Sequence, residues 1–98
     1  MREMNGPVSV IIPAYNEESG IEGVIRDLEK ILKQERIPNE VIVVDDGSVD
    51  GTAPAAERSG ARVIRHAKNR GYGASLKTGI MAAKHELIVI TDADGTYP

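Results

Sequence analysis

Four short apolar runs recur along the 98-residue chain. They lie at residues 8–12, 41–44, 61–64 and 87–90, and turn-forming or charged residues bound each of them. Val and Ile supply most of these positions, and β-branched side chains favour strands. Short continuous apolar runs are typical of strands that are buried on both faces. We therefore predict four strands, although Arg62 interrupts the third run.

Helical periodicity follows the first apolar run. From Ile21 to Leu32 the apolar residues stand three or four positions apart, which places them in one stripe along a helix. Ser19 and Glu22 have the spacing of a capping box at its start, and Pro38 is expected to end the segment. These positions predict a helix that packs its apolar stripe on the sheet.

Two further helices are predicted between the later runs. In the second helix, Asp50 is expected to be the N-cap, Pro54 falls in the first turn, and Gly60 provides a stop. The third helix spans about residues 72–84.

The elements therefore alternate between strand and helix, beginning and ending with a strand. Such alternation with short buried strands produces a parallel sheet with right-handed crossovers, so the predicted fold class is α/β. We expect the strand order 3-2-1-4, with the last strand beside the first. Because the sequence stops directly after a strand, residues 1–98 are expected to be one part of a larger domain.

Composition narrows the classes of protein that fit this pattern. Twelve Lys and Arg against fifteen Asp and Glu give a net charge of -3, which excludes a generally basic nucleic-acid binder. The chain has no Cys, so disulfides, thiolate metal sites and Cys nucleophiles are excluded. No apolar run approaches the ~18 residues that cross a membrane, and residues 1–6 lack the apolar core of a signal peptide. We expect a cytoplasmic segment with no membrane span and no nucleic-acid partner.

Charged side chains follow the predicted strands. In an open parallel sheet, ligands bind beyond the carboxyl ends of the strands, which here are followed by residues 13–18, 45–48, 66–73 and 92–94. These segments bring six carboxylates and two cations to one edge of the sheet. Like charges this close repel one another unless a metal, cationic side chains, or N–H donors from a base or ribose neutralise them. A ligand-binding edge of acidic character is therefore predicted.

The metal candidates at this edge are Asp92 and Asp94. Residues two apart on an extended segment point the same way, and two carboxylates on one face form a hard-oxygen site that suits Mg²⁺ or Mn²⁺. Such a site usually keeps waters and is completed by substrate phosphates. The alternative is that one Asp caps a turn while the other is solvated.

Other polar residues at this edge have two interpretations. Asp45 ends a buried strand, where a carboxylate can accept hydrogen bonds from a nucleoside, or it caps the following turn. For Asp46 we favour a turn or cap role. Glu17 either contributes to a binding site or pairs with the dipole of the first helical turn. The two histidines, His66 and His85, are isolated in the sequence, which favours a solvated or capping role and argues against zinc.

The segment before the third helix combines Lys68 and Arg70 with glycines at positions 71 and 73. A helix N-terminus preceded by such a loop suits a phosphate group. The alternative is that the glycines only permit a tight turn.

Four segments in order resemble motifs of family 2 glycosyltransferases. Residues 10–18 (VIIPAYNEE) are similar to the opening of that family, residues 43–52 (VVDDGSVDGT) to its second motif, and residues 91–98 (TDADGTYP) to its DxD metal motif. Residues 69–79 (NRGYGASLKTG) are similar to the third loop of the dolichol-phosphate mannose and polyprenyl-phosphate glucose synthase branch. The resemblance covers essentially the whole chain, and four motifs at this spacing are highly specific.

The resemblance implies a GT-A fold, of which residues 1–98 would be the half that binds the nucleotide sugar. It implies a nucleotide-diphosphate-sugar donor such as a UDP- or GDP-sugar, a divalent cation, Mg²⁺ or Mn²⁺, and inversion at the anomeric carbon. Carried over by position, the nucleoside pocket is lined by Pro13, Ala14, Tyr15 and Glu17, Asp45 hydrogen-bonds the base or ribose, and Asp92 and Asp94 hold the metal against the diphosphate.

The acceptor is less closely defined by the resemblance. Many members that act on polyprenyl phosphates have Gln at the position of Thr96, so the acceptor class stays open between a polyprenyl phosphate and other acceptors. The residues that receive or deprotonate the attacking group are expected after Pro98. No catalytic residue is therefore assigned within the chain, which is expected to be inactive by itself, and the full-length protein can be associated with the cytoplasmic face of a membrane.

Three other functions match the sequence in part. A sugar-nucleotide nucleotidyltransferase would need a Gly-rich loop with Arg and Lys after the first strand, which residues 13–16 do not provide. A phosphoacceptor receiver domain would carry its acidic pair after the first strand, whereas Asp45 and Asp46 follow the second. A non-catalytic nucleotide-binding fragment, completed by a partner, stays open.

The fourth strand is expected to leave one of its edges unpaired. An apolar edge strand is a template for pairing with another chain, and helix layers of a partial domain leave apolar surface uncovered. We therefore expect the 98-residue chain to form a two-fold homodimer through this edge.

Overall fold

The computed structural model describes residues 6–93 and has four strands and three helices in that range. The elements are β1 (Val8–Ala14), α1 (Ile21–Gln34), β2 (Asn39–Asp45), α2 (Thr52–Arg58), β3 (Arg62–Arg65), α3 (Tyr72–Ala82) and β4 (Leu87–Ile90). The predicted alternation of strands and helices is confirmed. β2 continues one residue past the end of its apolar run, so the strand ends at Asp45, at the predicted ligand edge.

All strand pairs in the sheet are parallel, and the strand order is β3-β2-β1-β4. Val10 of β1, for example, pairs with Val41 on one side and with Val89 on the other. The predicted α/β class and the order 3-2-1-4 are therefore confirmed. β1 lies inside the sheet between β2 and β4, and all of its residues are buried.

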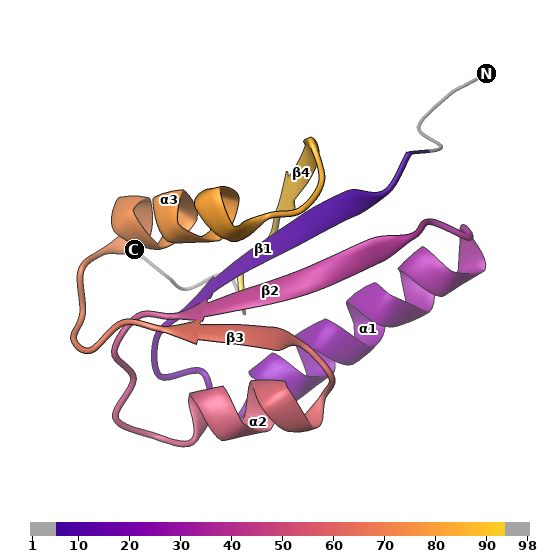
Figure 1. Ribbon diagram of the computed structural model, residues 1–98. Helices are drawn as coiled ribbons and strands as arrows, with labels where there is room; N and C mark the ends of the chain where they lie inside the picture. Colours follow the sequence, from indigo (N-terminus) through magenta and orange to yellow (C-terminus); the bar gives the residue numbers. More distant parts are fainter. Residues whose placement is uncertain (1–5, 94–98) are drawn as a thin grey trace.

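Helices cover both faces of the sheet (Figure 1). α1 and α2 lie on one face, where Val10 and Ile12 join the larger apolar cluster. α3 lies on the opposite face, where Ile11 and Val44 pack with Leu76 in a second cluster. Alternate residues of β1 thus contribute to two cores, which explains why its apolar run is continuous.

The capping box predicted for α1 is wrong. α1 follows the N-cap residue Gly20, and no side chain caps it. The carbonyl of Glu17 accepts the Gly20 N–H at 3.1 Å, so the backbone closes this turn without Ser19. The carboxylate of Glu22 instead forms an ion pair with Arg58 of α2, 3.0 Å away.

The start of α2 is also shifted by one residue. Its N-cap is Gly51 rather than Asp50. The Asp50 carboxylate nevertheless accepts the Thr52 N–H at 3.0 Å. Asp50 therefore satisfies one of the free N–H groups at the start of α2, although it stands one residue before the N-cap. Gly60, at φ 94°, follows the helix as the predicted stop.

The helices are short. α1 and α3 end at Gln34 and Ala82, a little before their predicted limits. Within the described range 6–93, none of the helices is long and apolar enough to cross a bilayer.

Candidate functional site

The carboxyl ends of β1, β2 and β4 meet at one edge of the sheet. Ala14, the last residue of β1, is in register with Asp45, the last residue of β2. On the other side of β1, the Thr91 N–H donates to the Ile11 carbonyl at 3.1 Å, which leads the chain after β4 to the same edge. Asp45 and Asp92 therefore flank β1 where the sequence predicts ligand binding.

Asp45 is a buried carboxylate with one oxygen that lacks a hydrogen bond. Its Oδ1 accepts the Ser48 N–H at 3.0 Å. Its Oδ2 lies 3.3 Å from Arg65 Nε but has no hydrogen-bond partner among the described residues, although it is shielded from solvent. A buried charged oxygen without a donor costs free energy, and the guanidinium compensates only its charge. This oxygen fits the predicted role of Asp45 as an acceptor for an N–H or O–H of a ligand.

Asp46 joins segments that are far apart in the sequence. Its Oδ1 accepts the His66 Nδ1–H at 2.7 Å and the Arg70 N–H at 2.8 Å, and its Oδ2 accepts the Gly71 N–H at 2.8 Å. Asp46 therefore makes long-range contacts that a turn or cap role does not include. His66 is buried, and its Nε2 lies 2.8 Å from Thr78 Oγ1, so the predicted solvated or capping role of His66 is wrong. No local spacing indicates these contacts, because the strand ends meet only in the folded sheet.

The β1–α1 loop and the β2–α2 loop are hydrogen-bonded to each other. The Asn16 N–H donates to Ser48 Oγ at 2.8 Å, and Asn16 Oδ1 accepts the Val49 N–H at 3.0 Å. The Glu17 N–H donates to Thr52 Oγ1 at 2.9 Å. These bonds fix the two loops at the ligand edge relative to one another. Nothing in the sequence pattern indicates that Asn16 and Thr52 join the loops in this way.

The four residues of the predicted nucleoside pocket differ in their exposure. Pro13 and Ala14 belong to the buried end of β1, so they contribute the floor of any site at this edge. Tyr15 is 37% exposed, while Glu17 is only 8% exposed. The structure therefore brings Tyr15 to the same edge as Asp45 and leaves its ring accessible.

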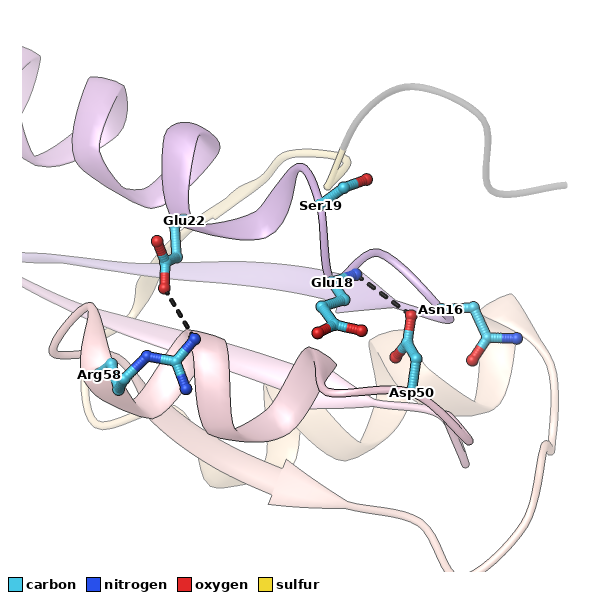
Figure 2. A pocket seen from close by; sticks show the side chains of 6 residues that line it. All are labelled: Asn16, Glu18, Ser19, Glu22, Asp50 and Arg58. Atoms are coloured by element: carbon cyan, nitrogen blue, oxygen red, sulfur yellow. Dashed lines mark hydrogen bonds and ion pairs between the residues drawn. The ribbon is translucent and has the colours of Figure 1, made fainter.

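A polar hollow of about 430 Å³ lies beside this edge, between the start of α1 and residues 50–58, which include α2 (Figure 2). Its lining residues are Asn16, Glu18, Ser19, Glu22, Asp50 and Arg58. Figure 2 shows the Glu22–Arg58 ion pair on one side and, on the other, the Glu18 N–H that donates to the Asp50 carboxylate. None of the predicted site residues within 6–93 lines the hollow, so it is separate from the predicted nucleotide site.

Asp50 connects two walls of this hollow. Its carboxylate accepts the Thr52 N–H at 3.0 Å, the Thr52 hydroxyl, and the Glu18 N–H at 3.3 Å. Burial raises the pKa of Asp50, but these hydrogen bonds to the charged form outweigh burial, so the pKa is lowered below its usual value. Asp50 is therefore ionised at neutral pH and holds the loops together.

Asp92 is exposed directly after β4, whereas Asp94 lies outside the described residues. Within residues 6–93, no three acidic or histidine side chains come together to hold a metal. The donor chemistry of an exposed carboxylate at an open edge nevertheless fits a hard cation that takes its other ligands from water and a diphosphate. Asp92 thus fits the role of one ligand, and its pairing with Asp94 stays a prediction.

The loop between β3 and α3 lies against the end of β2. We call residues 67–71 the basic loop, because Lys68 and Arg70 are exposed on it. Gly47 has a φ of 79°, and a Cβ on it would lie 2.5 Å from Asn69 N and 2.6 Å from Lys68 C. Glycine therefore permits both the left-handed turn and the close approach of the loop. Two positive side chains consequently stand next to the acidic end of β2.

The fold and the edge define a class of protein: open α/β units in which helices cover both faces of a parallel sheet and ligands bind beyond the carboxyl ends of the strands. The family described as Glycosyl transferase family 2 matches residues 9–98, so the chain belongs to this family. The resemblance seen in the four motifs is confirmed, and the receiver-domain and nucleotidyltransferase alternatives gain no support.

Known relatives include transferases that use lipid phosphates. The chain is 41% identical over 102 residues to dolichyl-phosphate beta-glucosyltransferase from Homo sapiens, which covers 90% of this chain and 31% of the relative. It is 38% identical over 97 residues to undecaprenyl-phosphate 4-deoxy-4-formamido-L-arabinose transferase from Pseudomonas paraeruginosa, covering 93% of this chain and 29% of the relative. The chain spans between 29% and 38% of the length of the curated relatives that it matches.

A solved structure has the same architecture. Glucosyl-3-phosphoglycerate synthase from Mycobacterium tuberculosis, in complex with Mn²⁺, UDP and phosphoglyceric acid, matches with a TM-score of 0.78 and 33% identity. The match covers 90% of this chain and 33% of that one. The GT-A fold expected from the resemblance is confirmed by this likeness.

Proposed function

We propose that this chain binds the nucleotide-diphosphate-sugar donor of a metal-dependent, inverting glycosyltransferase. The observation that carries the proposal is the buried Oδ2 of Asp45, which lacks a hydrogen-bond donor at the ligand edge of the sheet. Membership of family 2 and the UDP and Mn²⁺ in the matching synthase support it.

Each residue at the edge has a part in donor binding. Asp45 accepts an N–H or O–H of the base or ribose, and the accessible ring of Tyr15 packs against the nucleoside. Pro13, Ala14 and Glu17 form the inner wall behind it. UDP and GDP are the nucleotides that we expect to bind.

Asp92 and Asp94 are proposed to hold Mg²⁺ or Mn²⁺ against the diphosphate. A bound divalent cation supplies Lewis-acid neutralisation of the charge that develops on the leaving nucleotide. In the full-length protein, Asp92→Asn or Asp94→Asn should lower kcat by about 10²-fold or more, since such neutralisation is worth several kcal/mol.

The acceptor is proposed to be a polyprenyl phosphate, as the names of the relatives suggest. Because the chain spans 31% and 29% of those two relatives, the groups that bind and activate the acceptor are proposed to lie in sequence after Pro98. We propose that transfer takes place on the cytoplasmic side and that the 98-residue chain binds the donor without catalysing transfer.

Calorimetry tests the proposal directly. UDP and GDP are titrated into the chain with Mn²⁺ present or with EDTA, and we expect binding of one nucleotide that is at least about tenfold tighter with metal. Asp92→Asn should remove that difference, while Lys30→Ala, on the exposed surface of α1, should preserve it. Equal affinity with and without metal would overturn the metal role, and no binding of either nucleotide would overturn the proposed function.

A further inference from the structure

We propose that Asp46 and His66 are positioning residues of this site: they hold the basic loop at the ligand edge so that Lys68 and Arg70 bind the phosphates of the nucleoside diphosphate. The inference rests on the proposed function and deepens it, since it names the residues that hold the basic loop in the conformation that binds phosphate.

The first support is the set of donors on Asp46. This carboxylate is fully buried and accepts two consecutive backbone N–H groups of the basic loop, those of Arg70 and Gly71, each at 2.8 Å. One oxygen also accepts His66 Nδ1–H at 2.7 Å. Hydrogen bonds to a charged acceptor are among the stronger ones in proteins. Asp46 therefore holds two consecutive amide groups of the loop backbone, those of Arg70 and Gly71.

The second support is the connection that His66 makes to α3. Because the Asp46 carboxylate only accepts, Nδ1 carries the proton, and in the neutral ring Nε2 is then an acceptor. The Thr78 hydroxyl, 2.8 Å away on α3, donates to Nε2. The end of β2, the end of β3 and the middle of α3 are thus joined by one buried chain of hydrogen bonds.

The third support is the steric fit of the loop. A Cβ on Gly47 would lie within 3 Å of three backbone atoms of Lys68 and Asn69. Gly71, at φ 102°, turns the chain into α3. The loop backbone therefore packs tightly against Gly47 at Lys68 and Asn69, while the side chains of Lys68 and Arg70 are exposed.

The exposed cations lie on a loop next to the edge that carries the Asp45 oxygen without a hydrogen bond, and a loop ordered before the ligand arrives avoids the entropic cost of ordering during binding. The contacts described for Asp46 and His66 are to β3, the basic loop and α3, so in this proposal they act on a ligand through Lys68 and Arg70.

A double-mutant cycle separates this role from a general effect on the fold. UDP and GDP, each with Mn²⁺, are titrated into the wild type, the double variant Lys68→Ala/Arg70→Ala, Asp46→Asn, and the combination of all three. We expect a loss of about tenfold from either change alone, and less than about twofold further loss when Lys68 and Arg70 are removed from Asp46→Asn. Lys30→Ala again serves as the control for loss of an exposed lysine.

A second series tests His66. His66→Asn keeps an N–H donor at the position of Nδ1 and should retain affinity within about threefold, whereas His66→Leu should lose about tenfold. Amide exchange in the unliganded proteins gives a readout that needs no ligand. The amides of Arg70 and Gly71 should exchange faster in His66→Leu than in the wild type, with those of β1 unchanged.

The outcomes are distinguishable. If neither nucleotide binds to the wild type, the proposed function fails and the positioning role with it. If the wild type binds UDP or GDP and the losses in the cycle are additive, or His66→Leu binds as tightly as wild type, only the positioning role is overturned. If Asp46→Asn does not fold, the cycle is completed with His66→Leu, and the same additivity criterion decides.

Discussion

Asp45 and Asp46 are neighbours in the sequence, but their carboxylates meet different partners. Asp46 accepts three donors from its own chain, including the Arg70 and Gly71 N–H groups. Asp45 has one oxygen bonded to the Ser48 N–H and the other left without a donor. One acid is therefore satisfied within the fold, and the other has capacity for a ligand.

Replacing Asp45 should affect binding more than folding. Asp45→Ala removes the acceptor, and losing a hydrogen bond to a charged group costs about 1.5–3 kcal/mol, or about ten- to a hundredfold in affinity for UDP or GDP. The melting temperature should change little, because the lost Ser48 contact is offset by removing a buried oxygen without a donor. Calorimetry and thermal denaturation measure the two effects. Unchanged nucleotide affinity would contradict the role of Asp45.

Asp50→Ala is the opposite case and should mainly lower stability. It removes the acceptor for the Thr52 and Glu18 N–H groups, a change comparable to losing a helix cap, which costs about 1 kcal/mol. Nucleotide affinity should stay close to that of the wild type. If this variant lost binding at an unchanged melting temperature, the roles of Asp45 and Asp50 would be exchanged.

The stability difference at Asp50 should depend on pH. Because its pKa is lowered in the folded state, the ionised carboxylate contributes stability above the unfolded value of about 3.9, and the contribution is lost as the pH falls through the folded-state pKa. Thermal melting of wild type and Asp50→Ala should therefore converge below about pH 4. Glu40, whose pKa is raised by burial but lowered more strongly by hydrogen bonds from Ser9 and Lys84, destabilises both proteins alike in acid. A difference that stays constant down to pH 2 would contradict this assignment.

At the scale of elements, α3 approaches the sheet closely at Gly79. This glycine is buried, and a Cβ on it would collide with Ile11 Cγ2 of β1 and lie 3.3 Å from Val44 Cγ2 of β2. The absence of a side chain at this position thus sets how deeply α3 packs over the second core.

Gly79→Ala should destabilise the protein by about 1–3 kcal/mol, as overpacked core positions do. Gly73→Ala is the matched control, because Gly73 is exposed in the first turn of the same helix and a Cβ there meets nothing within 4 Å. The control should be neutral or stabilising by about 0.5–1 kcal/mol through helix propensity. Urea denaturation measures both changes, and equal effects of the two substitutions would contradict the packing account.

The elements were predictable from the sequence to the extent that they depend on periodicity. Continuous Val and Ile runs and one apolar stripe in α1 indicate strands and helices without knowledge of their neighbours. The helix start at Gly20 was not predictable, because the Glu17 carbonyl caps it through the backbone and leaves Ser19 unused. At the site, strand ends point to Asp45, but the bond between Asp46 and His66 forms only when β2 and β3 pair.

At the scale of the whole molecule, the two outer strands of the sheet differ. β3 has exposed arginines at both ends, Arg62 and Arg65, which discourage pairing with another chain. β4 has no charged residue, and Leu87, Val89 and Ile90 are 40%, 40% and 44% exposed. One side of the sheet is thus protected by charge, and the other presents apolar surface.

The two-fold homodimer through β4 stays a prediction, and the exposed edge supports it. Sedimentation of the 98-residue chain at micromolar concentration should show a dimer. Val89→Lys should shift it to monomer, whereas Val49→Lys, at a position 89% exposed in the β2–α2 loop, should leave the dimer intact. A wild-type monomer, or a dimer unaffected by Val89→Lys, would contradict pairing through this edge.

The position of β1 in the sheet has a consequence for synthesis of the chain. β1 is made first, yet one of its two neighbours is β4, with Val8 opposite Leu87, so the pairing joins the two ends of the described sequence. Contacts between residues so distant in sequence slow folding. Until residues 87–90 leave the ribosome, β1 has N–H and C=O groups along one side that only water or another chain can satisfy. The nascent polypeptide therefore exposes a largely apolar, half-paired strand until residues 87–90 emerge, and during that interval the strand is open to pairing with another chain.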